Sequence, residues 1–174
     1  CLEACDGRCA GVSLVITDPP YRSLDIDVIR GTTTRLVGGG GAASRKGGKV
    51  GEEANWFQTL ADADILTALG MLPLAATGAL YVFGGDVKTG LALFPLLSPK
   101  NVLVWDKGVI GMGYSWRRMH EWIAYCPRPG HALRSQAAGD IIRCSSEPEK
   151  RHPTEKPLGV ITPLILNSSD VGGV

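Results

Sequence analysis

The stretch VSLVITDPPY, residues 12–21, joins a mostly apolar, β-branched run to an acid, two prolines and a tyrosine. Residues 12–17 are apolar on both faces, which predicts a short strand in the interior of a parallel sheet. Pro19 and Pro20 each fix their own φ angle, lack a backbone donor and push the preceding residue toward an extended conformation. The stretch therefore predicts a buried strand that ends in a rigid turn led by Asp18.

The turn brings together an acid, a bare carbonyl and an aromatic ring at the place where open α/β sheets bind ligands, beyond the carboxyl ends of their strands. The carboxylate of Asp18 and the carbonyl of Pro19 can accept the two hydrogens of an amino group, while Tyr21 stacks on a flat ring. Such contacts would aim the amine at an electrophile, which is catalysis by positioning. A nucleobase flipped out of a duplex fits this corner. The alternative is an ordinary turn, because Asp-Pro is common in turns.

Helices and strands alternate in the rest of the chain after a long glycine-rich segment. Adjacent strands in its second half predict an antiparallel hairpin, and Pro95 and Pro163 are expected to interrupt helices. The order predicts an α/β sheet of parallel strands with an antiparallel edge. The expected elements are a helix over 56–70, a strand over 78–86, a weak helix over 87–97, strands over 101–107 and 121–127, and a helix that starts with Pro157.

Composition places the chain among ordinary globular proteins. It has 174 residues, 44% of them hydrophobic, and a net charge of +1, so global charge does not indicate a nucleic-acid partner. No apolar run is long enough to span a membrane and no signal peptide is present, which predicts a cytoplasmic protein without a membrane partner. Cys1, Cys5 and Cys9 lack the close pairs and histidines of a zinc site, so we expect no metal.

Basic charge is concentrated in the segment that follows the corner, a loop over residues 22–55 that we expect to be flexible. Six basic residues and two acidic ones lie between Arg22 and Lys49, an excess of four positive charges. This position suits contact with DNA phosphates, and a merely solvated loop is the alternative. The six basic residues are Arg22, Arg30, Arg35, Arg45, Lys46 and Lys49.

Three motifs in this order resemble the β class of amino-DNA methyltransferases. They are DPPY, then WDKGVIGMGYSWRRMHEWIAY at residues 105–125, then HPTEKP at residues 152–157. The opening CLEAC and the stretch GTTTRL, residues 31–36, also look like segments of this class and of its phage and prophage members. The resemblance covers nearly the whole chain. It implies a single domain with a Rossmann-like, S-adenosylmethionine-dependent methyltransferase fold and a mixed sheet.

The resemblance also implies roles for individual residues. Asp18, Pro19 and Tyr21 would bind the target amine and stack on the base, and Pro20 would fix the turn. Asp18 and the HPTEKP segment would lie against the cofactor. The segment comprises His152, Pro153, Thr154, Glu155, Lys156 and Pro157, of which Thr154 and Lys156 are the favoured contacts. The hairpin residues Arg117, Arg118, His120 and Glu121 would lie near the target pocket, with the two arginines on DNA, and residues 128–150 would form a short target-recognition segment. A proline-rich helix start and a solvated charged turn are the alternatives.

The implied activity is methyl transfer from S-adenosylmethionine to a base in double-stranded DNA, in DNA modification or restriction-modification. DPPY, rather than a serine-led version, favours adenine N6 over cytosine N4. A non-catalytic DNA-binding relative that has lost cofactor binding is an alternative from another class, and methylation of RNA or of a protein amide is a third. A homodimer is compatible with the resemblance.

One family motif is missing from the chain. In the family, a glycine-rich cofactor loop of the form DPF-x-GSGT follows HPTEKP and its helix, whereas this chain ends with NSSDVGGV, residues 167–174. The GGGG at residues 38–41 follows no convincing strand and does not replace it. We therefore expect an incomplete catalytic domain, cut from a longer protein, and only weak binding of S-adenosylmethionine by these 174 residues alone.

Overall fold

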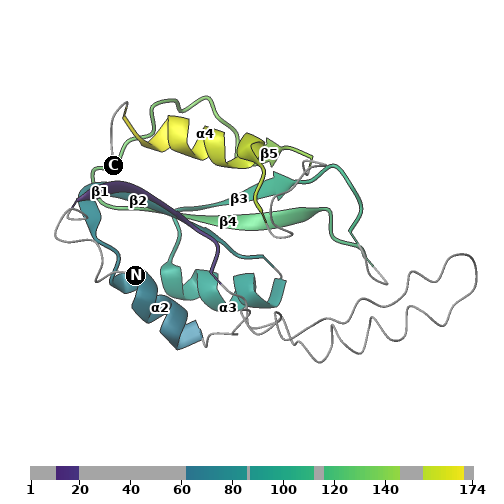
Figure 1. The fold of residues 1–174 in the computed structure, drawn as a ribbon, viewed down its shortest axis with the longest axis horizontal. Helices are drawn as coiled ribbons and strands as arrows, with labels where there is room; N and C mark the ends of the chain where they lie inside the picture. Colours follow the sequence, from purple (N-terminus) through teal and green to yellow (C-terminus); the bar gives the residue numbers. More distant parts are fainter. Residues whose placement is uncertain (1–10, 20–61, 86, 112–115, 146–154, 171–174) are drawn as a thin grey trace, which may run out of the picture.

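The computed structural model describes residues 11–19, 62–85, 87–111, 116–145 and 155–170. These residues form a mixed sheet with three helices around it (Figure 1). The strand order across the sheet is β1-β2-β4-β3-β5. In chain order the elements are β1 (Val12–Thr17), α2 (Asp62–Gly70), β2 (Leu74–Phe83), α3 (Val87–Leu97), β3 (Asn101–Asp106), β4 (His120–Pro127), β5 (Ile141–Arg143) and α4 (Leu158–Ser168).

Strand direction determines which ends of the strands share an edge of the sheet. β1 runs parallel to β2, and β4 runs antiparallel to both β2 and β3. β1, β2 and β3 therefore run in one direction, and their carboxyl ends lie at one edge. The predicted antiparallel hairpin is β3 and β4, but it does not form the edge of the described sheet. β4 lies between β2 and β3, and β5 pairs with the other side of β3 in parallel.

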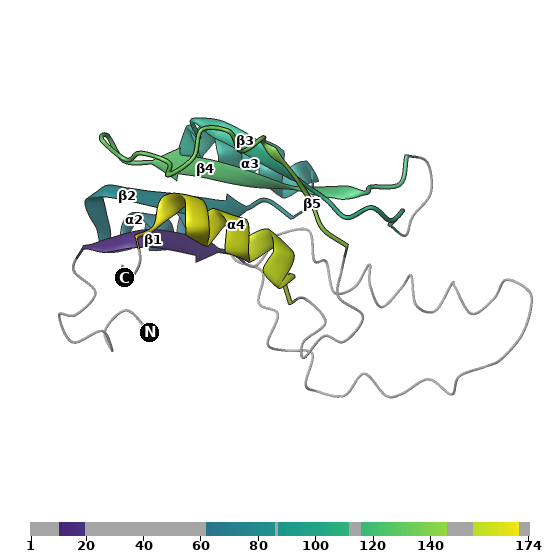
Figure 2. The ribbon, with the colours of Figure 1, turned by 90° about the horizontal axis from the view of Figure 1, so that it is seen from above.

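Helices cover both faces of the sheet, with α4 on one face and α2 and α3 on the other (Figures 1 and 2). Because side chains alternate along a strand, β2 and β4 contribute to two cores, one on each face of the sheet. The α4-face core contains Ala79, Tyr81, Phe83, Trp105, Ile123, Tyr125, Val160 and Leu164. The core under α2 and α3 contains Ile65, Val82, Leu93, Phe94 and Ala124.

Several predicted boundaries change in the structure. The strand expected over 78–86 is β2, which starts earlier at Leu74 and ends at Phe83. Pro95 does not break its helix, since α3 continues to Leu97. Pro157 is not the first helical residue of α4 but its extended N-cap. For β2 and α3, the packing of the whole element against the sheet outweighs the local signal of one glycine or proline.

Two further outcomes concern parts of the sequence with weak patterns. The short strand β5 lies in a stretch that was expected to be irregular, and its three residues are too few for an alternation to stand out. The first part of the predicted helix over 56–70 and the loop over 22–55 lie outside the described residues. Among the described residues, no helix is long and apolar enough to cross a membrane.

Candidate active site

The candidate site lies at the edge where the carboxyl ends of β1, β2 and β3 meet. Leu14 and Ile16 of β1 pack against the α4-face core, and Asp18 continues their alternation by one step beyond the strand. The Asp18 carboxylate therefore lies on the α4 side of this edge, with its side chain 28% exposed. The following Pro19 is buried.

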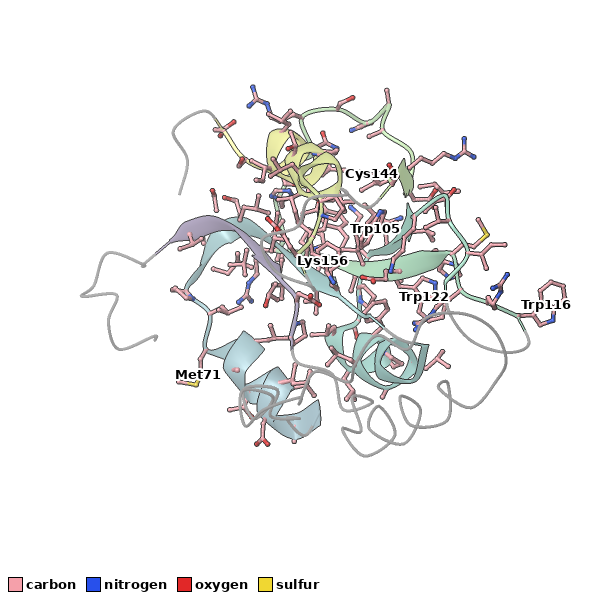
Figure 3. The ribbon with its side chains drawn as sticks, turned by 45° about the vertical axis from the view of Figure 1, so that its right-hand side comes forward. Met71, Trp105, Trp116, Trp122, Cys144 and Lys156 are labelled. Carbon is pink, nitrogen blue, oxygen red and sulfur yellow. The ribbon has the colours of Figure 1, made fainter. Side chains whose placement is uncertain are left out.

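Lys156 comes to the same place from the other end of the chain. The extended N-cap Pro157 carries the chain from Lys156 into α4, which Val160 and Leu164 pack onto the sheet. The Lys156 Nζ lies 2.8 Å from Asp18 Oδ2 and 5.1 Å from the centre of the Phe83 ring. In Figure 3 Lys156 lies within the body of the molecule, over the sheet. DPPY and HPTEKP are thus joined by a direct ion pair.

A second acid completes the cluster from the hairpin. Glu121 of β4 shares the α4 face with Ile123 and Tyr125, and its Oε2 lies 3.2 Å from Lys156 Nζ. That contact is an ion pair by distance, although the atoms are not aligned as a hydrogen bond. The other oxygen, Oε1, accepts a 2.5 Å hydrogen bond from Lys107 Nζ. The four charges alternate in sign along the row Asp18, Lys156, Glu121, Lys107, which we call the charge row.

The same alternation that places Asp18 also places Lys107. Leu103 and Trp105 of β3 face α4, and Lys107 is the next residue of that parity, just past the strand end. Its Nζ lies 4.8 Å from the centre of the Trp105 ring. Our sequence analysis did not identify Lys107 as a site residue. Extending the period-two pattern of a predicted strand two residues beyond its last apolar member would have found it.

The two acids of the charge row have pKa values displaced in opposite directions. Burial raises the pKa of Asp18 above its ordinary 3.8, with Glu121 adding to the rise and Lys156 opposing it. Burial also acts to raise the pKa of Glu121, but Lys156 and Lys107 together outweigh it, so that pKa is lowered from 4.5. Acids with divergent pKa values are a mark of sites with assigned acid–base roles. The directions of these shifts make Asp18 easier to protonate than an ordinary aspartate and Glu121 harder to protonate than an ordinary glutamate.

The hairpin tip carries the two predicted DNA-binding arginines. Arg117 is exposed, whereas the Arg118 Nη1 donates a 2.7 Å hydrogen bond to the Gly85 carbonyl and so fastens the hairpin to the start of α3. Trp116 beside them is 99% exposed and projects from the body of the molecule in Figure 3. The described tip therefore presents the Arg117 side chain and the Trp116 indole at the surface.

Part of the segment predicted for target recognition, residues 128–150, makes hydrogen bonds within the molecule. Arg134 donates to the Ser169 carbonyl through Nη1 and to the Asn167 carbonyl through its backbone N–H. The Ser135 N–H donates to Asn167 Oδ1 at 2.7 Å. These bonds hold the connection between β4 and β5 on the last turn of α4. The Arg143 Nε lies 3.7 Å from Asp106 Oδ2, and the Arg143 side chain is 82% exposed.

One apolar cavity lies away from the charge row. A cavity of about 420 Å³ lies on the other face of the sheet, where Gly90, Phe94, Val102 and Trp122 are among its lining residues. A methyl group on Gly90 would meet Trp122 at 2.8 Å, which accounts for glycine there. Because no charged side chain lines this cavity, it offers no acid–base chemistry. Within the described residues there is also no cluster of metal ligands.

The structure thus brings together Asp18, Lys156 and the hairpin residue Glu121, while Pro157 lies buried beside them. Glu155 is exposed next to Lys156, and His120 stacks on Trp122 with ring centres 6.1 Å apart. The other predicted residues lie outside the described part of the chain. These are Pro20, Tyr21, Arg22, Arg30, Arg35, Arg45, Lys46, Lys49, His152, Pro153 and Thr154.

Comparison with solved structures identifies the architecture. The crystal structure of the M1.HpyAVI–SAM complex, where SAM is S-adenosylmethionine, aligns with 97% of this chain and 72% of its own, at a TM-score of 0.58 and 12% identity. This is a Rossmann-like methyltransferase fold. A second crystal structure, that of M1.HpyAVI, aligns with 97% of this chain and 71% of its own at a TM-score of 0.56, also with 12% identity. No family model and no curated protein matches the sequence.

Proposed function

We propose that the protein is a DNA methyltransferase that transfers a methyl group from S-adenosylmethionine to the exocyclic amine of a flipped base, with adenine N6 as the target. The observation that carries the proposal is the meeting of DPPY and HPTEKP in the ion pair between Asp18 and Lys156. The site lies in a fold shared with M1.HpyAVI, a DNA methyltransferase crystallised with SAM. Fold likeness at 12% identity supports the class alone, so the target atom rests on the DPPY corner.

Asp18 is the group that handles the amine. Its carboxylate accepts a hydrogen from the amine and so aims the nitrogen lone pair, which is a positioning role. Bound S-adenosylmethionine would supply an electrophilic methyl group to this nitrogen, and its sulfur would keep the electron pair of the carbon–sulfur bond that the nitrogen replaces. The methylated nitrogen then carries an extra proton. The raised pKa of Asp18 makes this carboxylate a better acceptor for that proton than an ordinary aspartate.

Lys156 has the charge and position to serve the cofactor as well as Asp18. Its side chain is 16% exposed, so its ammonium is partly desolvated beside the corner. A methionine carboxylate is a chemically suitable further partner for this group, which has three donors. The residues present therefore fit the cofactor end that HPTEKP was predicted to hold. Arg117 at the hairpin tip and the basic segment after Tyr21 would contact the phosphates of double-stranded DNA.

The proposed activity is tested by incubating the protein, expressed from its complete gene, with unmethylated DNA and cofactor carrying a labelled methyl group. Nucleoside analysis should recover the label in N6-methyladenine. Label in N4-methylcytosine would support a DNA methyltransferase but would show that the target is cytosine N4 and not adenine N6. DNA binding without any labelled nucleoside would favour the non-catalytic alternative, and neither binding nor label would overturn the proposal.

A DNA role for the hairpin tip predicts a specific effect of Arg117→Ala. Removing one phosphate contact should weaken DNA binding several-fold at low salt, and the slope of log K against log salt should fall by about one. Arg117 is preferred to Arg118 because the latter also holds Gly85. Fluorescence anisotropy with labelled duplex at several salt concentrations measures both quantities. Lys100→Ala is the matched control, an exposed basic residue at the opposite end of β3; equal slopes for the two variants would exclude a contact at the tip.

A further inference from the structure

We propose that Glu121 is a positioning residue that shares the Lys156 ammonium with Asp18 and so weakens its hold on that carboxylate, which leaves Asp18 able to receive the target amine. This inference rests on the proposed function and adds a residue to the same site. The role is distinct from contact with base or cofactor, because Glu121 acts through Lys156.

The geometry makes Glu121 the fixed member of the charge row. It lies in β4, which is paired on both sides, and its direct register partner is Trp105 of β3. Lys107 fastens one of its oxygens at 2.5 Å, and its side chain is only 14% exposed. Asp18, in contrast, follows the last residue of β1, and its side chain is twice as exposed. Lys156 thus lies between a well-buried acid that a second lysine also contacts and a more exposed acid at the end of a strand.

Lys156 and the target amine are competitors for Asp18. Both bring N–H donors to the same carboxylate, and a charged ammonium forms the stronger hydrogen bond. With Lys156 Nζ at 2.8 Å from Asp18 and 3.2 Å from Glu121, the ammonium is shared between two anions. Without the charge on Glu121, the whole attraction of Lys156 would fall on Asp18, and a neutral amine would have to displace it.

The charges that face Asp18 come from three neighbouring elements. Lys156 precedes α4, Glu121 belongs to β4, and Lys107 follows β3. Lys156 and Lys107 lower the pKa of Asp18, whereas Glu121 raises it. Neutralising Glu121 should therefore lower the pKa of Asp18 in two ways. It removes the repulsion between the two carboxylates, and it leaves the Lys156 ammonium to interact with Asp18 alone. Removing the Lys156 charge should raise the pKa further.

The first test follows the Asp18 carboxyl directly by carbon-detected NMR titration, which needs no turnover. We expect its pKa to fall in Glu121→Gln and to rise in Lys156→Met, relative to the wild-type protein. An unchanged Asp18 pKa in Glu121→Gln would overturn the inference even if the enzyme is active. Should Glu121→Gln fail to fold, Glu121→Asp is the substitute, since its shorter side chain moves the negative charge away from Lys156 and Asp18 and should shift the pKa in the same direction by less.

The second test is kinetic and separates positioning from structure. At saturating cofactor, Glu121→Gln should lower kcat/KM for DNA roughly ten- to a hundredfold, because the corner is misaligned. Adding Lys156→Met to it should recover part of that loss, since the competing ammonium is gone, and Glu121→Asp should retain more activity than Glu121→Gln. Asp64→Asn, at an exposed position on α2, is the control and should behave as wild type.

The outcomes distinguish this inference from the proposed function. If the wild-type protein methylates no DNA, the proposed function is wrong, and the inference about Glu121 is wrong with it. A wild-type protein that is active, with a double variant no better than Glu121→Gln alone, leaves the methyltransferase in place and overturns only the role of Glu121. Partial recovery in the double variant supports both.

Discussion

Asp18→Asn is expected to lower methyl transfer to DNA by roughly a hundred- to a thousandfold, the usual cost of removing one group aimed at the reacting centre. Asparagine keeps the shape of the side chain but loses the charge that orients the amine and accepts its proton. Single-turnover transfer of a labelled methyl group measures the loss. Asp106→Asn, at the end of β3, which runs in the same direction as β1, is the control and should retain activity, because its amide oxygen can still accept the 2.9 Å bond from the Gly108 N–H.

The same variant should not lose stability at neutral pH. A pKa that is raised in the folded protein means that the unfolded chain ionises Asp18 first, so stability declines as pH rises from 3.8 through the folded pKa. Asp18→Asn lacks this titration, so its free energy of unfolding should rise relative to that of the wild type as the pH increases over that window. Denaturant unfolding at pH values on both sides of the window measures this difference in stability. A variant that is both inactive and clearly less stable at pH 7 would mean that Asp18 is a structural residue.

Phe83→Ala should have the largest effect on folding, a loss of about 3–5 kcal/mol in the free energy of unfolding. Phe83 is 0% exposed in the α4-face core, and its ring lies beneath Lys156. The truncation would leave a cavity beneath the charge row and remove the cation–π contact. Since domains are typically stable by only about 5–15 kcal/mol, this variant should unfold at markedly lower urea.

Urea denaturation followed by circular dichroism provides that measurement, and Met71→Ala is the control. Met71 is an apolar side chain too, but it is 64% exposed, so its truncation should change stability by no more than about 0.5 kcal/mol. Equal midpoints for the two variants would show that the sheet does not rely on the core beneath the site.

The sequence predicted the parts of the fold that repeat a pattern. β1 is confirmed over residues 12–17 because six apolar and β-branched residues fit one kind of strand. The hairpin of β3 and β4 is confirmed for the same reason. β5 was missed because it owes its pairing to an open edge of β3, a neighbour distant in sequence. Pro157 was misplaced by one position, since a proline suits both the cap and the first turn of a helix.

The sequence named three of the four residues of the charge row but did not predict the contacts between them. Asp18, Lys156 and Glu121 were each named from a motif, but Lys156 was assigned to the cofactor, with no indication that it would pair with Asp18. The direct ion pair depends on how far α4 extends over the sheet, which no local pattern specifies. The placement of Lys107 at the site depends on the exact residue at which β3 ends. The ion pair and the placement of Lys107 are both set by the packing of the folded molecule.

The contact between Asp18 and Lys156 has a consequence for the order of folding. It links the first strand of the described chain to the residue just before the last helix, whereas β3 and β4 close a short hairpin. Contacts between residues so distant in sequence form slowly, because most of the chain must already be in place. The corner should therefore become complete only in the final stage of folding. On the proposed function, a partly folded molecule would therefore have no competent site for methyl transfer.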